Sequence, residues 1–222
     1  MAKAKLHFRF DLEKLVAALG YFAESVTDLT KLKAAKLLYF ADQYHLFRYG
    51  RPVIGDSYVA MDLGPVPESA YQFIGRLTSP DEVDDPGRAL ATKWLWIQDR
   101  DAELRPLRYP VIRSRQAPDL GALSESDIEA LRAVLTKHGQ KSATDLVTLT
   151  HQHRAWIQAN ASRSKGSSVP LPYEAFFEDA SEMQRSQGLT LAELGQEDRD
   201  FAERFTRAGG ATKGTLANPV DH

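Results

Sequence analysis

Residues 29–50, LTKLKAAKLLYFADQYHLFRYG, constrain the fold more than any other part of the chain. On a helix these residues would form two adjoining stripes, one of Leu37, Phe40, Ala41, Tyr44 and Phe47 and the other of Leu38, Ala41 and His45. A helix with apolar coverage this wide has to be surrounded by other elements. Asp28 or Thr30 can cap its start, and Gly50 can end it. The sequence therefore predicts a central, largely buried helix.

The motif GPVP follows a short β-rich segment, Val53–Met61. A proline biases the residue before it toward extended conformations, so Gly64 and Val66 are kept out of a helix. Pro67 suits the first position of the next helix, which carries an apolar face as far as Leu77. The motif predicts a stiff corner between a strand and a helix.

Further helix starts carry capping signals. Asp11 can cap a first helix, and Ser124 with Asp127 forms a capping-box pattern before another. Ser142 with Asp145 repeats that pattern and opens a helix toward residue 151. These positions predict three more helices.

The middle of the chain shows a strand pattern. Residues 78–90 are polar and acidic and are predicted to form a loop. Trp94 and Trp96 then alternate with aliphatic residues, and Leu104–Ile112 can return as the partner strand of a hairpin. Prolines in the return strand limit the sheet that can form. We expect a small antiparallel sheet.

Together these elements predict a mainly α fold: a compact helical domain with a small antiparallel β element (α+β) and a flexible C-terminal tail. We expect the domain to span residues 1–183, a helical extension to span 184–207, and the tail to span 208–222.

Composition excludes several classes of site. The 222 residues contain no cysteine, which excludes disulfides, cysteine-ligated zinc and cysteine nucleophiles and fits a cytoplasmic protein. No stretch approaches roughly 18 uninterrupted apolar residues, so no membrane span is expected. The 30 acidic and 28 basic residues nearly cancel, which gives no bulk attraction to nucleic acid.

No common catalytic or phosphate-binding motif occurs in the chain. An enzyme would require Asp42, His45 and His151 to converge, but we interpret Asp42 and His45 as an internal polar contact that fixes packing. His151 and His153 lack a third ligand at a suitable spacing, so we interpret them as a hydrogen-bonding histidine and a surface one. The sequence predicts no catalytic residue, no metal and no cofactor.

Residues 124–156 have the spacing of a helix-turn-helix motif. The second helix would present Thr144, Asp145, Thr148 and His151, with no Lys or Arg before Arg154. Phosphate contacts supply most of the affinity for DNA, so this helix is poorly equipped for it. A DNA-binding transcriptional regulator is the alternative hypothesis, with nucleic acid an unfavoured partner.

Three blocks in order resemble the Panacea domain, the antitoxin domain shared with SocA-like proteolytic adaptors. They are LTKLKAAKLLYFADQYHLFRYGRPVI, AMDLGPVPESAY, and LSESDIEALRAVLTKHGQKSATDLVTLTHQHRAWIQA. The matching framework residues are Lys33, Lys36, Leu37, Leu38, Tyr39, His45, Ser142, Ala143, Leu146, Thr150, His151 and Trp156, together with Ala60, Gly64, Pro65 and Val66. The blocks cover about residues 11–160.

The resemblance implies a bacterial or phage antitoxin that neutralises a cognate toxin, encoded by an adjacent gene, through direct binding. Relatives in the family instead deliver the toxin to a AAA+ protease, so a proteolytic adaptor is a second form of the same hypothesis. We predict partner contacts at two places, the corner and the hairpin. The residues are Gly64, Pro65, Val66, Pro67, Trp94 and Trp96.

Overall fold

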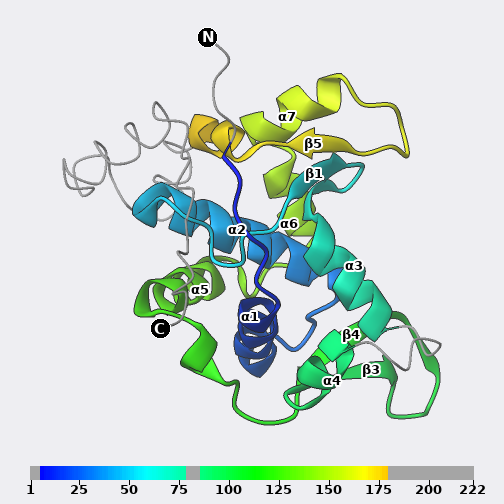
Figure 1. The fold of residues 1–222 in the computed structure, drawn as a ribbon. Coiled ribbons are helices and arrows are strands. Elements are labelled where there is room, and N and C mark those ends of the chain that lie inside the picture. Colours follow the sequence, from blue (N-terminus) through cyan, green and yellow to red (C-terminus); the bar gives the residue numbers. More distant parts are fainter. Residues whose placement is uncertain (1–5, 79–85, 180–222) are drawn as a thin grey trace, which may run out of the picture.

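Helix α2 (Lys31–Tyr49) crosses the middle of the molecule with the other elements around it (Figure 1). The computed structural model describes residues 6–78 and 86–179. Every residue from Lys33 to Leu46 is buried, which confirms the predicted central helix. The remaining α-helices are α1 (Leu12–Ser25), α3 (Glu68–Leu77), α4 (Pro86–Thr92), α5 (Glu125–His138), α6 (Ala143–Thr150) and α7 (Arg154–Ala161). Two 3-10 helices are η1 (Leu120–Ala122) and η2 (Tyr173–Asp179).

Local capping chemistry sets the starts of α1, α2, α5 and α6, as predicted. Asp11 accepts a hydrogen bond from the Lys14 N–H at the start of α1, and Thr30, not Asp28, caps α2. Complete capping boxes stand at Ser124 and Ser142. Gly50 ends α2 in the left-handed conformation.

One antiparallel sheet has the strand order β2-β1-β5, with β1 at Tyr58–Met61, β2 at Gly64–Pro67 and β5 at Val169–Leu171. The GPVP motif forms all of β2 and leads directly into α3, which confirms the corner. Pro67 is the last extended residue, because it pairs with Tyr58 across the sheet, and α3 begins one residue later than predicted.

Strand β1 is shorter than the predicted segment Val53–Met61. The N–H groups of Val53 and Ile54 donate to Asp42 Oδ1, at 2.8 and 3.0 Å, instead of to a neighbouring strand. The buried carboxylate of α2 therefore holds the first part of this segment as a loop.

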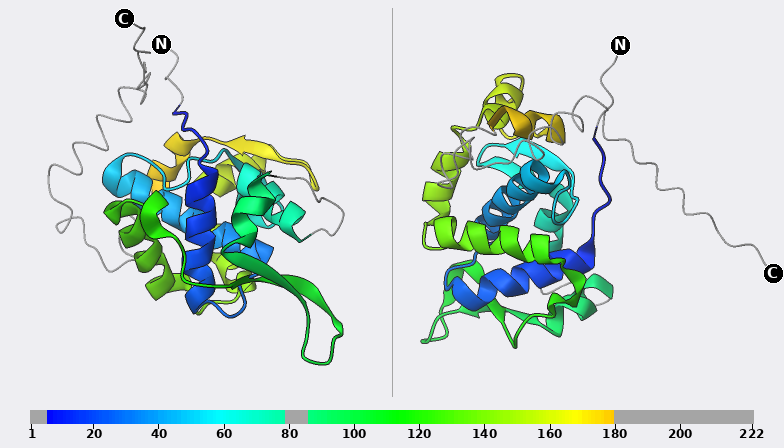
Figure 2. Two further views of the ribbon diagram at one scale, coloured as in Figure 1. Left: turned by 60° about the horizontal axis from the view of Figure 1, so that its bottom comes forward. Right: turned by 90° about the vertical axis from the view of Figure 1, so that its left-hand side faces the viewer.

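The hairpin of β3 (Leu95–Arg100) and β4 (Pro106–Ser114) confirms the second predicted element. It projects from the helical body (Figure 2). The base of β4 joins the core through Ile112, whose N–H donates to the Leu29 carbonyl. The predicted loop 78–90 is wrong over its last residues, because α4 begins at Pro86, a residue suited to the first turn of a helix.

At the C-terminal end of the described chain, the 3-10 helix η2 places Phe176 in the core. The predicted extension 184–207 and tail 208–222 lie outside the described residues. Within the described ranges, no helix combines the length and the apolar composition needed to cross a membrane.

Candidate protein-interaction site

Six of the residues that carry the sequence signature meet in one cluster, which we call the Lys36 corner: Lys36, Gly64, Pro65, Thr150, His151 and Trp156. Lys36 Nζ donates to the Pro65 carbonyl at 2.8 Å. Within the described residues no carboxylate forms an ion pair with this ammonium. Burial lowers the pKa of Lys36 to about 7. The corner thus contains a buried lysine whose amine donates to a backbone oxygen and whose charged form is disfavoured by burial.

Gly64 allows the backbone to approach this lysine. Its φ of 97° lies in the left-handed region, where glycine carries no steric cost. A Cβ at this position would lie 2.6 Å from Thr150 Oγ1 and 2.7 Å from Lys36 Nζ. Both neighbours are fully buried, so the site has no room for a side chain.

His151 and Trp156 close the other side of the corner. Their rings stack with centroids 3.9 Å apart and an interplanar angle of 7°. The Trp156 indole N–H donates to the Met61 carbonyl at 3.1 Å. Burial and the charge of Lys36 lower the pKa of His151. The hydrogen bond from Trp156 to Met61 joins α7, just after the α6–α7 turn, to the end of β1.

Tyr39 and His153 add a second contact beside the corner. The Tyr39 hydroxyl lies 3.0 Å from His153 Nδ1, and burial raises the pKa of this tyrosine well above its ordinary value. His151 and His153 therefore have separate aromatic partners. In the parts of the chain that are described, no group of three or more potential ligands is arranged to hold a metal ion.

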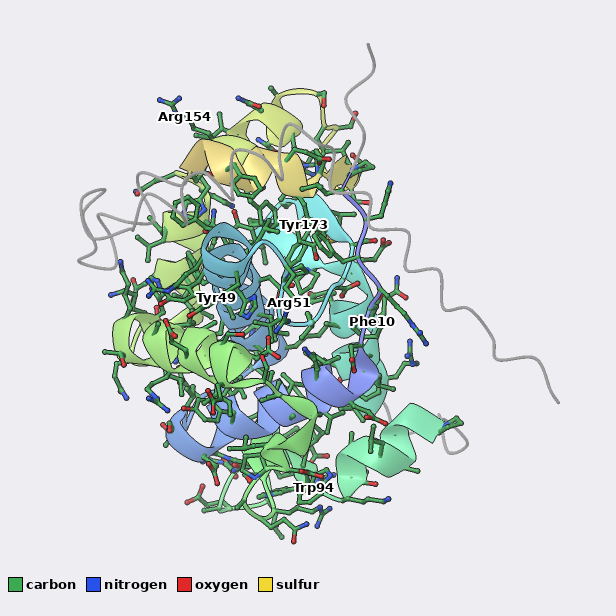
Figure 3. All side chains as sticks on the ribbon, turned by 60° about the vertical axis from the view of Figure 1, so that its left-hand side comes forward. Phe10, Tyr49, Arg51, Trp94, Arg154 and Tyr173 are labelled. Carbon is green, nitrogen blue, oxygen red and sulfur yellow. The ribbon has the colours of Figure 1, made fainter. Side chains whose placement is uncertain are left out.

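A second polar cluster, the Asp127 cluster, joins α1, α2 and α5. The buried Asp127 accepts from Lys14 Nζ at 2.7 Å and from Arg51 Nη1 at 2.8 Å, as well as from the Ser124 N–H. Burial opposes ionisation, but these hydrogen bonds and the Arg51 charge hold the pKa of Asp127 at about 2. Arg51 reaches the surface beside Tyr49 (Figure 3).

His45 belongs to this cluster and not to a catalytic pair with Asp42. His45 Nδ1 donates to the Arg51 carbonyl at 2.6 Å, and Nε2 lies 2.9 Å from the Ser126 hydroxyl. Burial lowers the pKa of His45 to about 4. Asp42 instead binds the 53–54 backbone and the Tyr58 hydroxyl, and burial raises its pKa to about 7.

Among the described residues, the two most exposed large apolar side chains, Leu104 and Tyr109, lie on the hairpin. Leu104 at its tip is 73% exposed, Tyr109 on β4 is 62% exposed and Trp96 on β3 is 39% exposed. Trp94, before β3, is partly buried and packs against the core. Leu104 also adopts a left-handed φ of 62°, a strained conformation for a leucine.

The predicted partner-binding residues thus fall into two environments. Gly64, Pro65, Val66 and Pro67 are buried, whereas Trp96 is exposed. Contact of a partner with any of them stays a prediction. The sequence did not single out Leu104 or Tyr109, although an isolated leucine inside the polar turn DRDAELR was an available signal.

The predicted helix-turn-helix segment forms α5, a short turn and α6. Helix α6 packs against α2 and β2 through Leu146 and Thr150, and it exposes Thr144, Asp145 and Thr148. Its exposed face therefore carries no basic residue, as the sequence indicated. The hypothesis of DNA binding stays a prediction.

A family model described as "Antitoxin SocA-like, Panacea domain" matches residues 35–157, more than half of the chain. The match confirms the resemblance seen in the three sequence blocks, over a narrower range than residues 11–160. It includes the Lys36 corner and the hairpin. No curated protein and no solved structure gives a match.

Proposed function

Because this chain belongs to the SocA-like Panacea antitoxin domain family, we propose that it neutralises a protein toxin by binding it directly. The family match is the observation that carries this proposal. We place the toxin gene beside the gene for this chain and the complex in the cytoplasm, in keeping with the absence of cysteine.

The exposed hairpin supports a binding role and gives it a location. Tryptophan, tyrosine and arginine dominate the energetically important contacts of protein interfaces. Trp96 and Tyr109 are exposed here, and the Arg108 guanidinium lies 5.2 Å from the Tyr109 ring centroid. The strained, exposed Leu104 at the tip also favours a functional use over a packing one. We therefore propose that the toxin contacts the hairpin.

The buried polar groups support a role without catalysis. Asp42, His45 and His151 would have to act together in an enzyme of the kind considered from the sequence. Each instead contacts its own structural partners: a loop backbone, the Asp127 cluster and the Trp156 ring. We propose that these groups hold the scaffold and that the protein works by complex formation.

The test is co-expression with each neighbouring open reading frame. Growth arrest by one neighbour, relieved by this protein, together with co-purification of the two chains, is the expected result. Toxicity that this protein does not relieve, or the absence of toxicity from both neighbours, would contradict the proposal. A catalytically inactive toxin variant allows the complex to be purified when the active toxin limits growth.

Delivery to a AAA+ protease is the alternative mechanism within the same function. Removal of residues 180–222 tests it, because the family match ends before them. If the chain is an adaptor that uses this segment, the truncated protein still binds the toxin but the half-life of the toxin in cells increases. An unchanged half-life with unchanged binding favours sequestration.

A further inference from the structure

A pocket of about 250 Å³ lies where α2, α5 and the α6–α7 turn meet. Its polar lining comes from Lys137 and His138 at the end of α5, Lys141 in the following turn, and Gln152 and His153. Phe40 of α2 and Leu149 of α6 form its apolar walls. None of its lining residues was a predicted site residue.

Two nitrogen atoms of this pocket are buried and lack a hydrogen-bond partner among the described residues: Lys137 Nζ and His138 Nδ1. His138 is 95% buried, with its ring stacked on Phe40 at a centroid distance of 4.2 Å and an interplanar angle of 13°. Buried polar groups in folded proteins almost always have a partner. Both nitrogen atoms are therefore open to an acceptor that enters the pocket.

The charged side chains around the pocket favour an anionic acceptor. Two lysines, Lys137 and Lys141, line the pocket, and among the described residues no aspartate or glutamate does. Asp145, on the helix that follows Lys141, is held by the N–H and hydroxyl of Ser142 as a helix cap. Burial and the charge of Lys141 lower the pKa of Lys137 to about 8. An anion bound beside Lys137 would stabilise its charged form against both the burial and the charge of Lys141.

We propose that this pocket binds one carboxylate group. Lys137 and Lys141 supply the positive charge, the N–H tautomer of His138 Nδ1 donates a hydrogen bond, and Phe40 and Leu149 pack against the aliphatic carbons next to the carboxylate. The source is either a small dicarboxylate or an acidic side chain of a bound protein. Binding of the free probe does not depend on the proposed antitoxin function.

The test is a titration of the full chain, labelled with ¹³C at lysine Cε and ¹⁵N in histidine rings, with sodium glutarate at constant ionic strength. The Lys137 and His138 signals should shift saturably, and the pKa of Lys137 should rise from about 8 by about one unit or more. Signals that follow only ionic strength would overturn the proposal, as would inorganic phosphate binding more tightly than glutarate.

Matched variants locate the effect. Lys137→Met should weaken glutarate binding at least tenfold, and Lys141→Gln should weaken it severalfold. Lys93→Met, at an exposed lysine before β3, should leave it unchanged. Equal affinity in all three variants would contradict the assignment. If N-acetyl-glutamate amide binds at least as tightly as glutarate, the natural source is a protein side chain; preference for glutarate indicates a small metabolite.

Discussion

The Lys36 corner and the hairpin differ in almost every physical respect. The corner is buried, contains a lysine with a depressed pKa and a glycine in the left-handed conformation, and is built from residues far apart in sequence. The hairpin is a local structure that projects into solvent and exposes Trp96, Leu104 and Tyr109. Leu104 at its tip is 73% exposed and has a left-handed backbone, and no other large apolar residue in the described chain combines the two.

The comparison shows that a residue can matter for one of two reasons, because it is buried in a crowded site or because it is accessible to a partner. The motif residues of the corner are distinctive because little space is available there: a lysine amine, a backbone turn and two stacked rings share a small volume. The hairpin residues are ordinary in sequence but accessible. Substitutions in the corner should therefore act on stability, and substitutions in the hairpin on binding.

The largest effect should come from Gly64→Ala. The new Cβ would be forced against Thr150 Oγ1 and Lys36 Nζ in a left-handed backbone. Strain and overpacking together should cost about 4 kcal/mol. Thermal unfolding should show a fall in Tm of about 10 °C.

Gly166→Ala is the matched control, since Gly166 has a φ of 79° but no atom within 4 Å of its Cβ position. It should cost only about 1 kcal/mol. Equal destabilisation by the two substitutions would show that the crowding around Gly64 has no energetic role.

The second effect concerns Asp127→Asn. This change leaves Lys14 and Arg51 without their buried carboxylate and should destabilise the fold by about 3 kcal/mol, measured by chemical denaturation at pH 7. Because the pKa of Asp127 falls from 3.8 to about 2 in the folded protein, its contribution is present above pH 3.8 and is lost as pH falls through 2. The variant should lose this acid sensitivity.

Asp145→Asn provides the comparison, since Asp145 occupies the same capping-box position in α6 but is exposed. It should have the smaller effect of the two. A loss of stability in Asp145→Asn as large as that in Asp127→Asn would mean that helix capping, and not the buried ion pairs, accounts for both.

The third effect is a pH dependence from the corner. The pKa of Lys36 falls from 10.5 to about 7 on folding, so the unfolded chain binds more protons between these values. The free energy of unfolding should therefore rise with pH above 7, by at most about 1.4 kcal/mol per pH unit. Lys36→Met should reduce that slope between pH 7 and 9, as measured by urea denaturation. An identical slope in both proteins would contradict the depressed pKa of Lys36 in the folded state.

The starts of α1, α2, α5 and α6, the GPVP corner and the hairpin could be predicted because each follows from neighbouring residues. Ser124 and Asp127 meet within one turn, and Gly50 needs only its own left-handed conformation to end α2. Strand β5 could not be predicted. It has three residues, one of them Pro170, and exists because β1 offers it an edge.

The candidate sites were harder still to predict from the sequence, because their contacts join residues that are far apart along the chain. The family resemblance named Lys36, His151 and Trp156, but not that Trp156 would bind the Met61 carbonyl 95 residues away. Asp42 and His45 were predicted to form one internal polar contact, but Asp42 binds the 53–54 loop backbone and His45 binds Ser126. These partners depend on tertiary structure. The carboxylate pocket needs three separate helical segments and has no sequence motif at all.

The smallest effect on stability and the most direct test of the proposed function is Leu104→Asp. Aspartate tolerates the left-handed conformation better than leucine, and the side chain is exposed, so the free energy of unfolding should change by less than about 0.5 kcal/mol. If the hairpin tip enters the interface with the toxin, affinity measured by calorimetry should fall about thirtyfold, or about 2 kcal/mol.

Ile157→Asp, at an exposed apolar residue of α7, should leave affinity unchanged. Loss of affinity in Ile157→Asp but not in Leu104→Asp would move the interface from the hairpin to the α7 face and leave the antitoxin function itself intact.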